Sequence, residues 1–269
     1  MNKEYDIITI GPDCRSRGYL TGWMLIPTKN SGRLSFPFDL AVHHTDVVVK
    51  HLHEDFENYF TNIKYGYKSG NRYYWTNDND RTIYYHDLDC GDNYNKFHKR
   101  YNNRIKNFQK TLKNDDKFLF FVTFFTSQTG KPEDINNLYN ELKLYRNDKP
   151  FKLLVYDIED VLKNHNINPD VKILVSLIPD ENPMGNWDKT KDASDEMRKY
   201  LNKLKELTIQ SIKEEGFDVI YYQKNYKDKF QSWIKYKLPQ IFSITNNWVD
   251  HYKVMILFGH KFNLFKIKD

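Results

Sequence analysis

Cysteine is scarce in this chain, whose 269 residues include only Cys14 and Cys90. Two cysteines in a chain of this length do not make the disulfide framework of a small secreted domain. The sequence also holds no Cys-x-x-Cys pair, so we expect no structural zinc ribbon. The chain is therefore expected to fold in a reducing, cytoplasmic environment.

Long apolar runs are missing as well. The opening stretch, MNKEYDIITI, contains too short an apolar run for a signal peptide. No other stretch approaches the roughly 18 consecutive apolar residues of a membrane span. These absences predict a soluble protein without a membrane partner.

The common phosphate-binding loops are absent too. Neither Gly-x-x-x-x-Gly-Lys-Ser/Thr nor Gly-x-Gly-x-x-Gly occurs, which speaks against a phosphoryl-transfer or nucleotide enzyme. The run HDLDCGD, residues 86–92, does hold several candidate metal ligands. They mix hard and soft donors and select no particular metal, so we predict no metal site and no cofactor.

Basic residues outnumber acidic ones but are not clustered in one part of the sequence. The net charge of +5 comes from 41 Lys and Arg against 36 Asp and Glu, and both signs are interspersed along the chain. Nucleic-acid-binding proteins usually cluster their basic residues on one face or arm, so nucleic acid is not the expected partner. The densest basic stretch, Lys96–Lys113, is interpreted as an amphipathic helix with a solvated basic face. An anion-binding surface on this helix is the alternative.

Short apolar runs rich in Val, Ile and Phe predict strands that are covered on both faces of a sheet. Helical patterns separate several of these runs, and such alternation is typical of an α/β fold with a mostly parallel sheet flanked by helices. The expected strands are Tyr5–Ile10, Phe118–Phe125, Lys152–Tyr156, Lys172–Ile178, Asp218–Tyr222 and Val254–Phe258. The expected helices are Arg15–Trp23, Ala41–His53, Lys96–Lys113, Asp134–Tyr145 and Asp192–Glu214.

Residues 64–86 interrupt this alternation. The stretches YGYKSGNRYYW and TIYYH predict strands of a small antiparallel insertion, with a polar turn at residues 77–80 between them. The chain shows no internal repeat and no long low-complexity linker. We therefore expect one α/β domain over residues 1–269.

Cys14 follows the first predicted strand by four residues. In an open α/β sheet, ligands bind outside the carboxyl ends of the strands. The N–H groups and dipole at the start of the expected helix, together with Arg15 and Arg17, favour a thiolate. The N–H groups of the turn Asp13–Arg15 are placed to receive an oxyanion. The alternative is that Cys14 only fills space in the core, as cysteines often do.

A thiol nucleophile needs an imidazole within reach. Of the nine histidines, His86 is the best candidate, because it ends an apolar strand and Asp87 follows at once. A strand end is a rigid mount for such a group. The remaining histidines that lie close together are interpreted as surface or capping residues; they are His43, His44, His51 and His53.

Asp39 and Cys90 each leave two interpretations open. The stretch SFPFDL, residues 35–40, is typical of a buried, rigid turn that fixes one carboxylate. Asp39 either caps the helix that follows or holds a histidine or a substrate hydroxyl. Cys90, in a polar loop, is either incidental or a resolving thiol for Cys14.

Four stretches together resemble a family of uncharacterised proteins described as papain-like cysteine peptidases. They are TIGPDC, FPFDL, YYHDLD and the Tyr-x-x-Arg of RYNNRIKNF. The resemblance covers roughly residues 5–125, and this chain has Leu40 where members of the family often carry Trp.

Carried onto this sequence, the resemblance implies that Cys14 is the nucleophile and His86 the general base. It adds Asp39 or Asp87 as the acid that orients His86. Arg104 is implied as a helper that binds substrate near the site.

The predicted layout differs from that of papain, whose cysteine lies on a long helix and whose histidine lies on an antiparallel barrel. A cysteine directly after the first strand is closer to small α/β esterases. The layout also resembles a capsule-polysaccharide enzyme family with a Cys–His pair and an acyl-coenzyme A substrate. Hydrolysis and acyl transfer share one intermediate, an acyl-thioester on the cysteine.

The sequence therefore predicts a cysteine-dependent hydrolase or acyltransferase that acts on an ester, thioester or amide carbonyl. Asp13 and Arg15 lie in the turn expected to bind the substrate. The expected substrate is a glycan or a small acyl conjugate, and acyl-coenzyme A would be an acyl donor, not a bound cofactor. The alternatives are a papain-like peptidase and a non-catalytic module that binds phosphate, nucleic acid or glycan.

Overall fold

The computed structural model describes residues 4–114, 117–179 and 195–222, together with the backbone of three strands between residues 242 and 266. The chain divides into two compact units, Met1–Ile26 with Leu34–Tyr222, and Pro27–Arg33 with Gln223–Asp269. The expectation of one domain over residues 1–269 stays a prediction.

A parallel sheet lies at the centre of the first unit. Its described strands are ordered β1 (Tyr5–Thr9), β5 (Phe118–Phe125), β6 (Phe151–Asp157) and β7 (Val171–Val175). Every neighbouring pair is parallel, which confirms the predicted α/β class. The run FLFFVTFF forms β5 over the predicted residues because both faces of this strand are buried, as a continuous apolar run requires.

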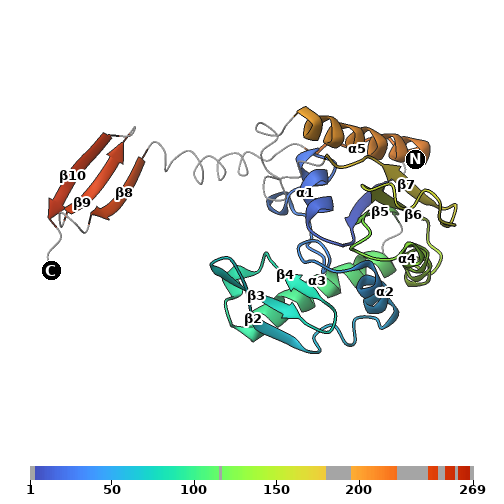
Figure 1. Cartoon of the computed structure of the whole chain (residues 1–269), viewed down its shortest axis with the longest axis horizontal. Helices are drawn as coiled ribbons and strands as arrows, with labels where there is room; N and C mark the ends of the chain where they lie inside the picture. The colour runs from blue at the N-terminus through green and yellow to red at the C-terminus, as the bar shows by residue number, and fades with distance from the viewer. Residues whose placement is uncertain are drawn as a thin grey trace. The chain divides into compact units, whose positions relative to one another are not determined.

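Helices cover both faces of this sheet (Figure 1). On one face lie α1 (Arg15–Gly22) and α5 (Asp195–Glu214), which pack with Phe120, Val122 and Phe124 of β5. On the other face lie α2 (Thr45–His53), α3 (Tyr94–Asn114) and α4 (Pro132–Tyr145), which pack with Leu119, Phe121 and Phe125. Residues of one strand therefore serve two separate cores, because successive side chains of a strand point to opposite faces.

The antiparallel insertion around residues 64–86 is confirmed. Its strands are β2 (Ile63–Ser69), β3 (Arg72–Asn77) and β4 (Thr82–Tyr84), in that order in the sheet. Both neighbouring pairs are antiparallel. β4 leads through His86 into a short 3-10 helix, η2 (Leu88–Cys90), and then into α3. The insertion thus brings His86 to the start of the basic helix.

The second unit contains a separate antiparallel sheet in the order β10 (His260–Lys266), β9 (Tyr252–Leu257) and β8 (Phe242–Asn247). It also contains the 3-10 helix η1 (Lys29–Ser31). The predicted strand Val254–Phe258 overlaps β9, so it belongs to this antiparallel sheet and not to the parallel one; Phe258 itself lies outside the described residues.

Two predicted elements are wrong. Residues 218–222 form no strand: the N–H of Ile220 donates to the Tyr5 hydroxyl at 3.0 Å, and that of Tyr222 donates to the Met24 carbonyl at 2.8 Å. These donors are therefore used outside any ladder. The helix predicted from Ala41 begins instead at Thr45. Within the described ranges, no helix combines the length and apolar character needed to cross a bilayer.

Candidate active site

The turn that carries Cys14 is fixed to the centre of the sheet. The hydroxyl of Thr123, on β5, donates to the carbonyl of Gly11 at 3.0 Å. Gly11 has φ +60°, and a Cβ there would lie 3.2 Å from Cγ2 of Val48, so this position favours glycine. The N–H of His43 donates to the carbonyl of the next residue, Pro12, at 2.7 Å. Contacts from two directions thus set where β1 ends and where the turn begins.

Cys14 is the N-cap residue of α1, is partly exposed, and takes no part in a disulfide. In the described part of the chain, the first-turn N–H groups of Ser16 and Arg17 have no hydrogen-bond partner. Such N–H groups and the helix dipole favour negative charge on a thiol beside them. Cys14 thus lies at the amino end of α1, and the thiolate predicted there stays a prediction.

Asp13 and Arg15 bind each other. Asp13 Oδ1 accepts a hydrogen bond from the backbone N–H of Arg15 at 2.7 Å, and Oδ2 accepts one from Nε at 2.8 Å. The guanidinium also lies over the ring of Phe124, 5.0 Å from its centroid. Because the N–H of Arg15 is engaged inside the turn, the first-turn N–H groups without a partner among the described residues are those of Ser16, which is fully buried, and Arg17, which is partly exposed.

Asp39 is fully buried and joins three segments. Its carboxylate accepts hydrogen bonds from the hydroxyl of Thr9, from Nη1 of Arg17 at 2.7 Å and from the N–H of Phe36 at 2.9 Å. None of these partners belongs to α2, whose N-cap residue is His44. The interpretation of Asp39 as a helix cap is therefore wrong. Asp39 instead links three segments: β1, α1 and the loop that runs from α1 to α2.

Asp87 is buried and fastens the end of β4 to α3. Its carboxylate accepts hydrogen bonds from Arg100 Nη1 at 2.9 Å and from the Tyr101 hydroxyl at 2.7 Å. Arg104 donates from both Nη1 and Nη2, at 3.3 and 3.1 Å. Arg104 lies four positions after Arg100 and three after Tyr101, so both of these side chains are its neighbours on the helix surface. Arg104 thus binds the acid that directly follows His86, and its role as a helper that binds substrate stays a prediction.

His86 lies between β4 and η2 and has exposed surface. Among the described residues its ring has no hydrogen-bond partner. Protein atoms around the ring desolvate it and lower its pKa; Asp87 opposes this, whereas the charges of Arg104 and Arg17 lower the pKa further. A neutral imidazole with unengaged ring nitrogens is the form that a general base requires.

A bridge at Ser35 links α1 to α3. The Ser35 hydroxyl accepts a hydrogen bond from Arg17 Nη1 at 3.5 Å, and its carbonyl accepts one from Asn107 Nδ2 at 3.5 Å. Arg104 lies three positions before Asn107, and Arg17 lies three positions after Cys14, so each pair shares a helical face. The start of α1, the end of β4 and α3 thus meet around Arg17. Direct pairing of Cys14 with His86 stays a prediction.

The sequence analysis missed how the two acids are held. The contacts of Asp87 had a signal, namely the helical spacing of Arg100, Tyr101 and Arg104. The contact of Asp39 with Arg17 had none, because it spans 22 positions without any periodic pattern.

Two of the histidines interpreted as surface or capping residues are buried instead. His43 is 0% exposed and His51 is 1% exposed. Nε2 of His43 lies 3.2 Å from the Tyr59 hydroxyl, and Nε2 of His51 lies 3.6 Å from Oδ2 of Asp80. Burial lowers the pKa of both rings, and that of His51 to about 4. They are neutral groups of an aromatic core and not parts of the candidate site.

Cys90 differs from Cys14 in its surroundings. It is 4% exposed, and burial raises the pKa of its thiol. It forms no disulfide. A buried thiol of this kind is a natural internal reference for the reactivity of Cys14.

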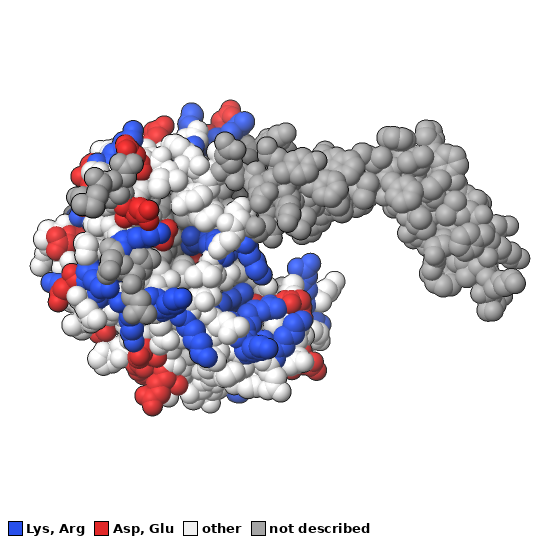
Figure 2. Space-filling view, turned by 180° about the vertical axis from the view of Figure 1, so that it is seen from behind, with Lys and Arg blue, Asp and Glu red and all other residues white. Residues whose placement is uncertain are grey.

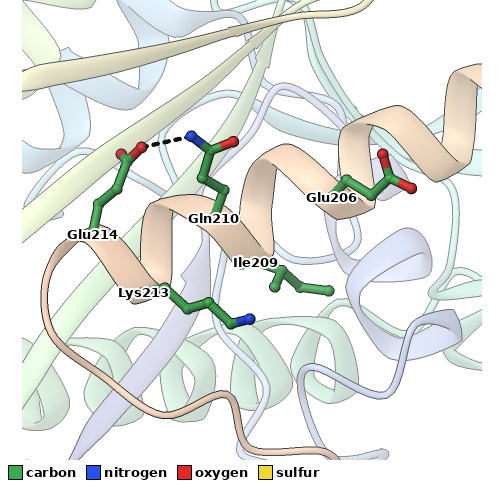
Figure 3. A pocket seen from close by; sticks show the side chains of 5 residues that line it. All are labelled: Glu206, Ile209, Gln210, Lys213 and Glu214. Carbon is green, nitrogen blue, oxygen red and sulfur yellow. Dashed lines mark hydrogen bonds between the residues drawn. The ribbon is translucent and has the colours of Figure 1, made fainter.

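A hollow along α5 is separate from these groups (Figure 3). Its described lining is Glu206, Ile209, Gln210, Lys213 and Glu214, and Gln210 donates to Glu214 at 2.8 Å. None of these residues is a cysteine or a histidine, and none was predicted for the site. We therefore do not place the active site there.

No group of three or more His, Cys, Asp and Glu side chains suited to a metal ion occurs in the part of the chain that the structure describes. Comparisons of the chain with protein-family models, with curated proteins and with solved structures found no match. The resemblance to the papain-like family stays a prediction.

Proposed function

We propose that this protein is a cysteine-dependent hydrolase or acyltransferase in which Cys14 is the nucleophile and His86 the general base. The substrate is an ester, thioester or amide of a glycan or a small acyl conjugate, and acyl-coenzyme A is a candidate acyl donor. No bound cofactor is needed for this chemistry. We propose a cytoplasmic location for it.

The observation that carries the proposal is the state of His86. Its ring nitrogens have no partner among the described residues, and its lowered pKa keeps it neutral at pH 7. Arg17 connects it to the thiol, because the charge of Arg17 acts on His86 and Arg17 shares a helical face with Cys14.

The proposed reaction has two steps. Sγ of Cys14 attacks the carbonyl carbon while His86 takes the thiol proton, and the N–H groups of Ser16 and Arg17 bind the oxyanion. The acyl-thioester forms as the bond to the leaving group breaks, and the leaving group takes the proton from His86. Water or an acceptor hydroxyl then attacks the thioester carbonyl and gives its proton to His86. The C–S bond breaks, the acyl group leaves as an acid or on the acceptor, and the Cys14 thiolate takes the proton back from His86.

The two acids take positioning roles in this proposal. Asp87 acts on His86 by charge and by fixing the end of β4 to α3. Asp39 acts through Arg17, which it holds at 2.7 Å. A papain-like peptidase activity is a narrower form of the same chemistry. A non-catalytic module would use the basic face of α3, but there Arg100 and Arg104 are already bound to Asp87.

The test is the pH dependence of iodoacetamide alkylation at Cys14 and Cys90, read by peptide mass spectrometry. We expect Cys14 to react well below its usual pKa of about 8.5 and Cys90 to react slowly. The variant His86→Ala should slow the reaction of Cys14 at neutral pH and leave that of Cys90 unchanged.

The exposed His53→Ala is the matched control, because its ring contacts Glu141 and no residue of the site. If Cys14 titrates like an ordinary thiol, or if His86→Ala behaves like His53→Ala, the catalytic proposal is wrong. A reactive Cys14 that depends on His86 would be followed by a screen of acyl substrates.

A further inference from the structure

Arg17 has hydrogen-bonding capacity that the protein does not use. Its Nη1 atom donates to Asp39 at 2.7 Å and to Ser35 at 3.5 Å. Its Nε and Nη2 atoms have no partner among the described residues, and they are not among the fully buried unpartnered atoms. One edge of the guanidinium is therefore held by the fold while the other is open to a ligand.

The buried carboxylate fixes the direction of this open edge. Asp39 has no exposed surface and is itself tied to the N–H of Phe36 at 2.9 Å and to the hydroxyl of Thr9. An arginine held at one nitrogen by a buried acid is pre-organised, so little side-chain entropy remains to be lost when a ligand binds. A surface arginine has no such support.

A second guanidinium, that of Arg104 on α3, adds positive charge, and it acts on His86 as Arg17 does. Both terminal nitrogens of Arg104 donate to the carboxylate of Asp87. The guanidinium carbon of Arg104 lies 4.4 Å from the ring centroid of Tyr101. The Ser35 bridge places the helix face of Arg104 beside Arg17. Figure 2 shows that Lys and Arg side chains gather on one side of the described unit, with fewer Asp and Glu among them.

The need for a positive charge beside the buried Asp39 does not by itself explain why an arginine with two unpartnered nitrogens lies there. One charge-assisted hydrogen bond from Nη1 already supplies Asp39 with a counter-charge. A guanidinium offers a planar fork that matches a carboxylate or a phosphate, and here the part of the fork formed by Nε and Nη2 is the open one.

We propose that Arg17 binds an anionic group of the substrate, a carboxylate or a phosphate, next to the scissile carbonyl. Arg104 contributes charge from α3 without a direct contact. The substrate is thus an anionic glycan or acyl conjugate. That this anionic molecule is a substrate rests on the proposed function. The binding of an anion at Arg17 does not, because it requires no reactive thiol.

The test uses Cys14→Ala, which removes the nucleophile and leaves Arg17 in place. Inorganic phosphate and acetate are titrated separately at pH 7.5, with chloride at the same ionic strength as reference. The reporter is the ring C–H resonance of His86, assigned with His86→Gln. We expect saturable shifts with phosphate or acetate beyond those with chloride, and at least about tenfold weaker binding in Arg17→Gln.

Arg81→Gln is the matched control, because Arg81 is exposed and its carboxylate partner, Asp46, lies 3.4 Å away on the surface. It should bind the probes as the parent does. If Arg17→Gln does not fold, Arg17→Gln combined with Asp39→Asn removes both buried charges together and gives the same comparison.

The outcomes separate the two proposals. Shifts equal to those with chloride, or equal affinity in Arg17→Gln and Arg81→Gln, overturn the anion site. Saturable binding that depends on Arg17 supports it, even where alkylation shows no coupling of Cys14 to His86. In that case the proposed anion site is supported, and only the catalytic proposal is wrong.

Discussion

The guanidinium of Arg17 and the carboxylate of Asp39 meet at 2.7 Å, and the carboxylate has no exposed surface. This pair joins the helix that begins at the thiol to the turn SFPFDL. A buried ion pair of this kind is costly to break from one side, because the remaining charge loses its partner in a medium of low polarity. The pair therefore makes the geometry at the start of α1 dependent on Asp39.

Asp39→Asn is expected to lower the free energy of unfolding by about 3 kcal/mol, because it leaves Arg17 without its buried partner. Urea unfolding measures this change. Asp46→Asn is the control, since Asp46 forms an exposed pair with Arg81 and should change stability by less than about 0.5 kcal/mol. Equal effects of the two substitutions would contradict the role given to Asp39.

Arg17→Gln is expected to raise the pKa of His86, because the charge of Arg17 holds it down. A base that must be neutral loses activity as the pH falls through its pKa, so the Cys14 reaction in this variant should fail at a higher pH than in the parent. Asp87→Asn should move the pKa in the opposite direction. NMR titration of the His86 ring measures both, and shifts of the same sign would refute the electrostatic account.

Acid should destabilise the fold through His51. Burial lowers its pKa from the usual 6.5 to about 4 in the folded chain. Between these values the unfolded chain binds a proton that the folded chain does not, so stability is lost as the pH falls through this window. The loss is on the order of 3 kcal/mol by pH 4.

His51→Phe tests this effect, since it keeps a ring beside Tyr59, whose centroid lies 4.7 Å away, and removes the titrating group. Urea unfolding at pH 7 and pH 4.5 should show a smaller pH dependence than in the parent. The exposed His53→Gln should leave the dependence unchanged. A pH dependence in His51→Phe as large as in the parent would assign the effect to other groups, such as the buried His43.

Arg146→Met is expected to lower stability by about 3 kcal/mol or more. Arg146 is fully buried, and its guanidinium donates to the carbonyls of Leu112 at 3.2 Å, Lys117 at 2.9 Å and Pro150 at 3.1 Å. Methionine keeps most of the side-chain volume but leaves these carbonyls without a donor. Thermal or urea unfolding measures the loss of stability. The exposed Arg198→Met is the control, and a loss in Arg146→Met no larger than in this control would contradict the role given to Arg146.

The sheet was predictable because its strands are continuous apolar runs. Phe118–Phe125 has the expected bounds, and the position of Cys14 after the first strand follows from Gly11 and Pro12. The conformation of residues 218–222 was not predictable from the sequence. An apolar run can also pack as an extended segment that forms no hydrogen bonds with a neighbouring strand. The distinction depends on partners such as Tyr5, which lies 215 positions away.

The candidate site was predictable in its residue types but not in its contacts. Asp39, His86 and Asp87 could be singled out from their local sequence. Which arginine binds which acid could not, because the partners come from segments that are joined only by the folded chain. The burial of His43 and His51 was missed for the same reason: the aromatic residues that cover them come from other elements.

The hydrogen bonds at Gly11 and Pro12 have a consequence for how the thiol's turn moves. One carbonyl is held by the central strand and the other by the segment before α2, so the turn has no hinge of its own. A substrate must therefore fit a site that is already formed, and selectivity will come from its shape and charge and not from closure of this turn.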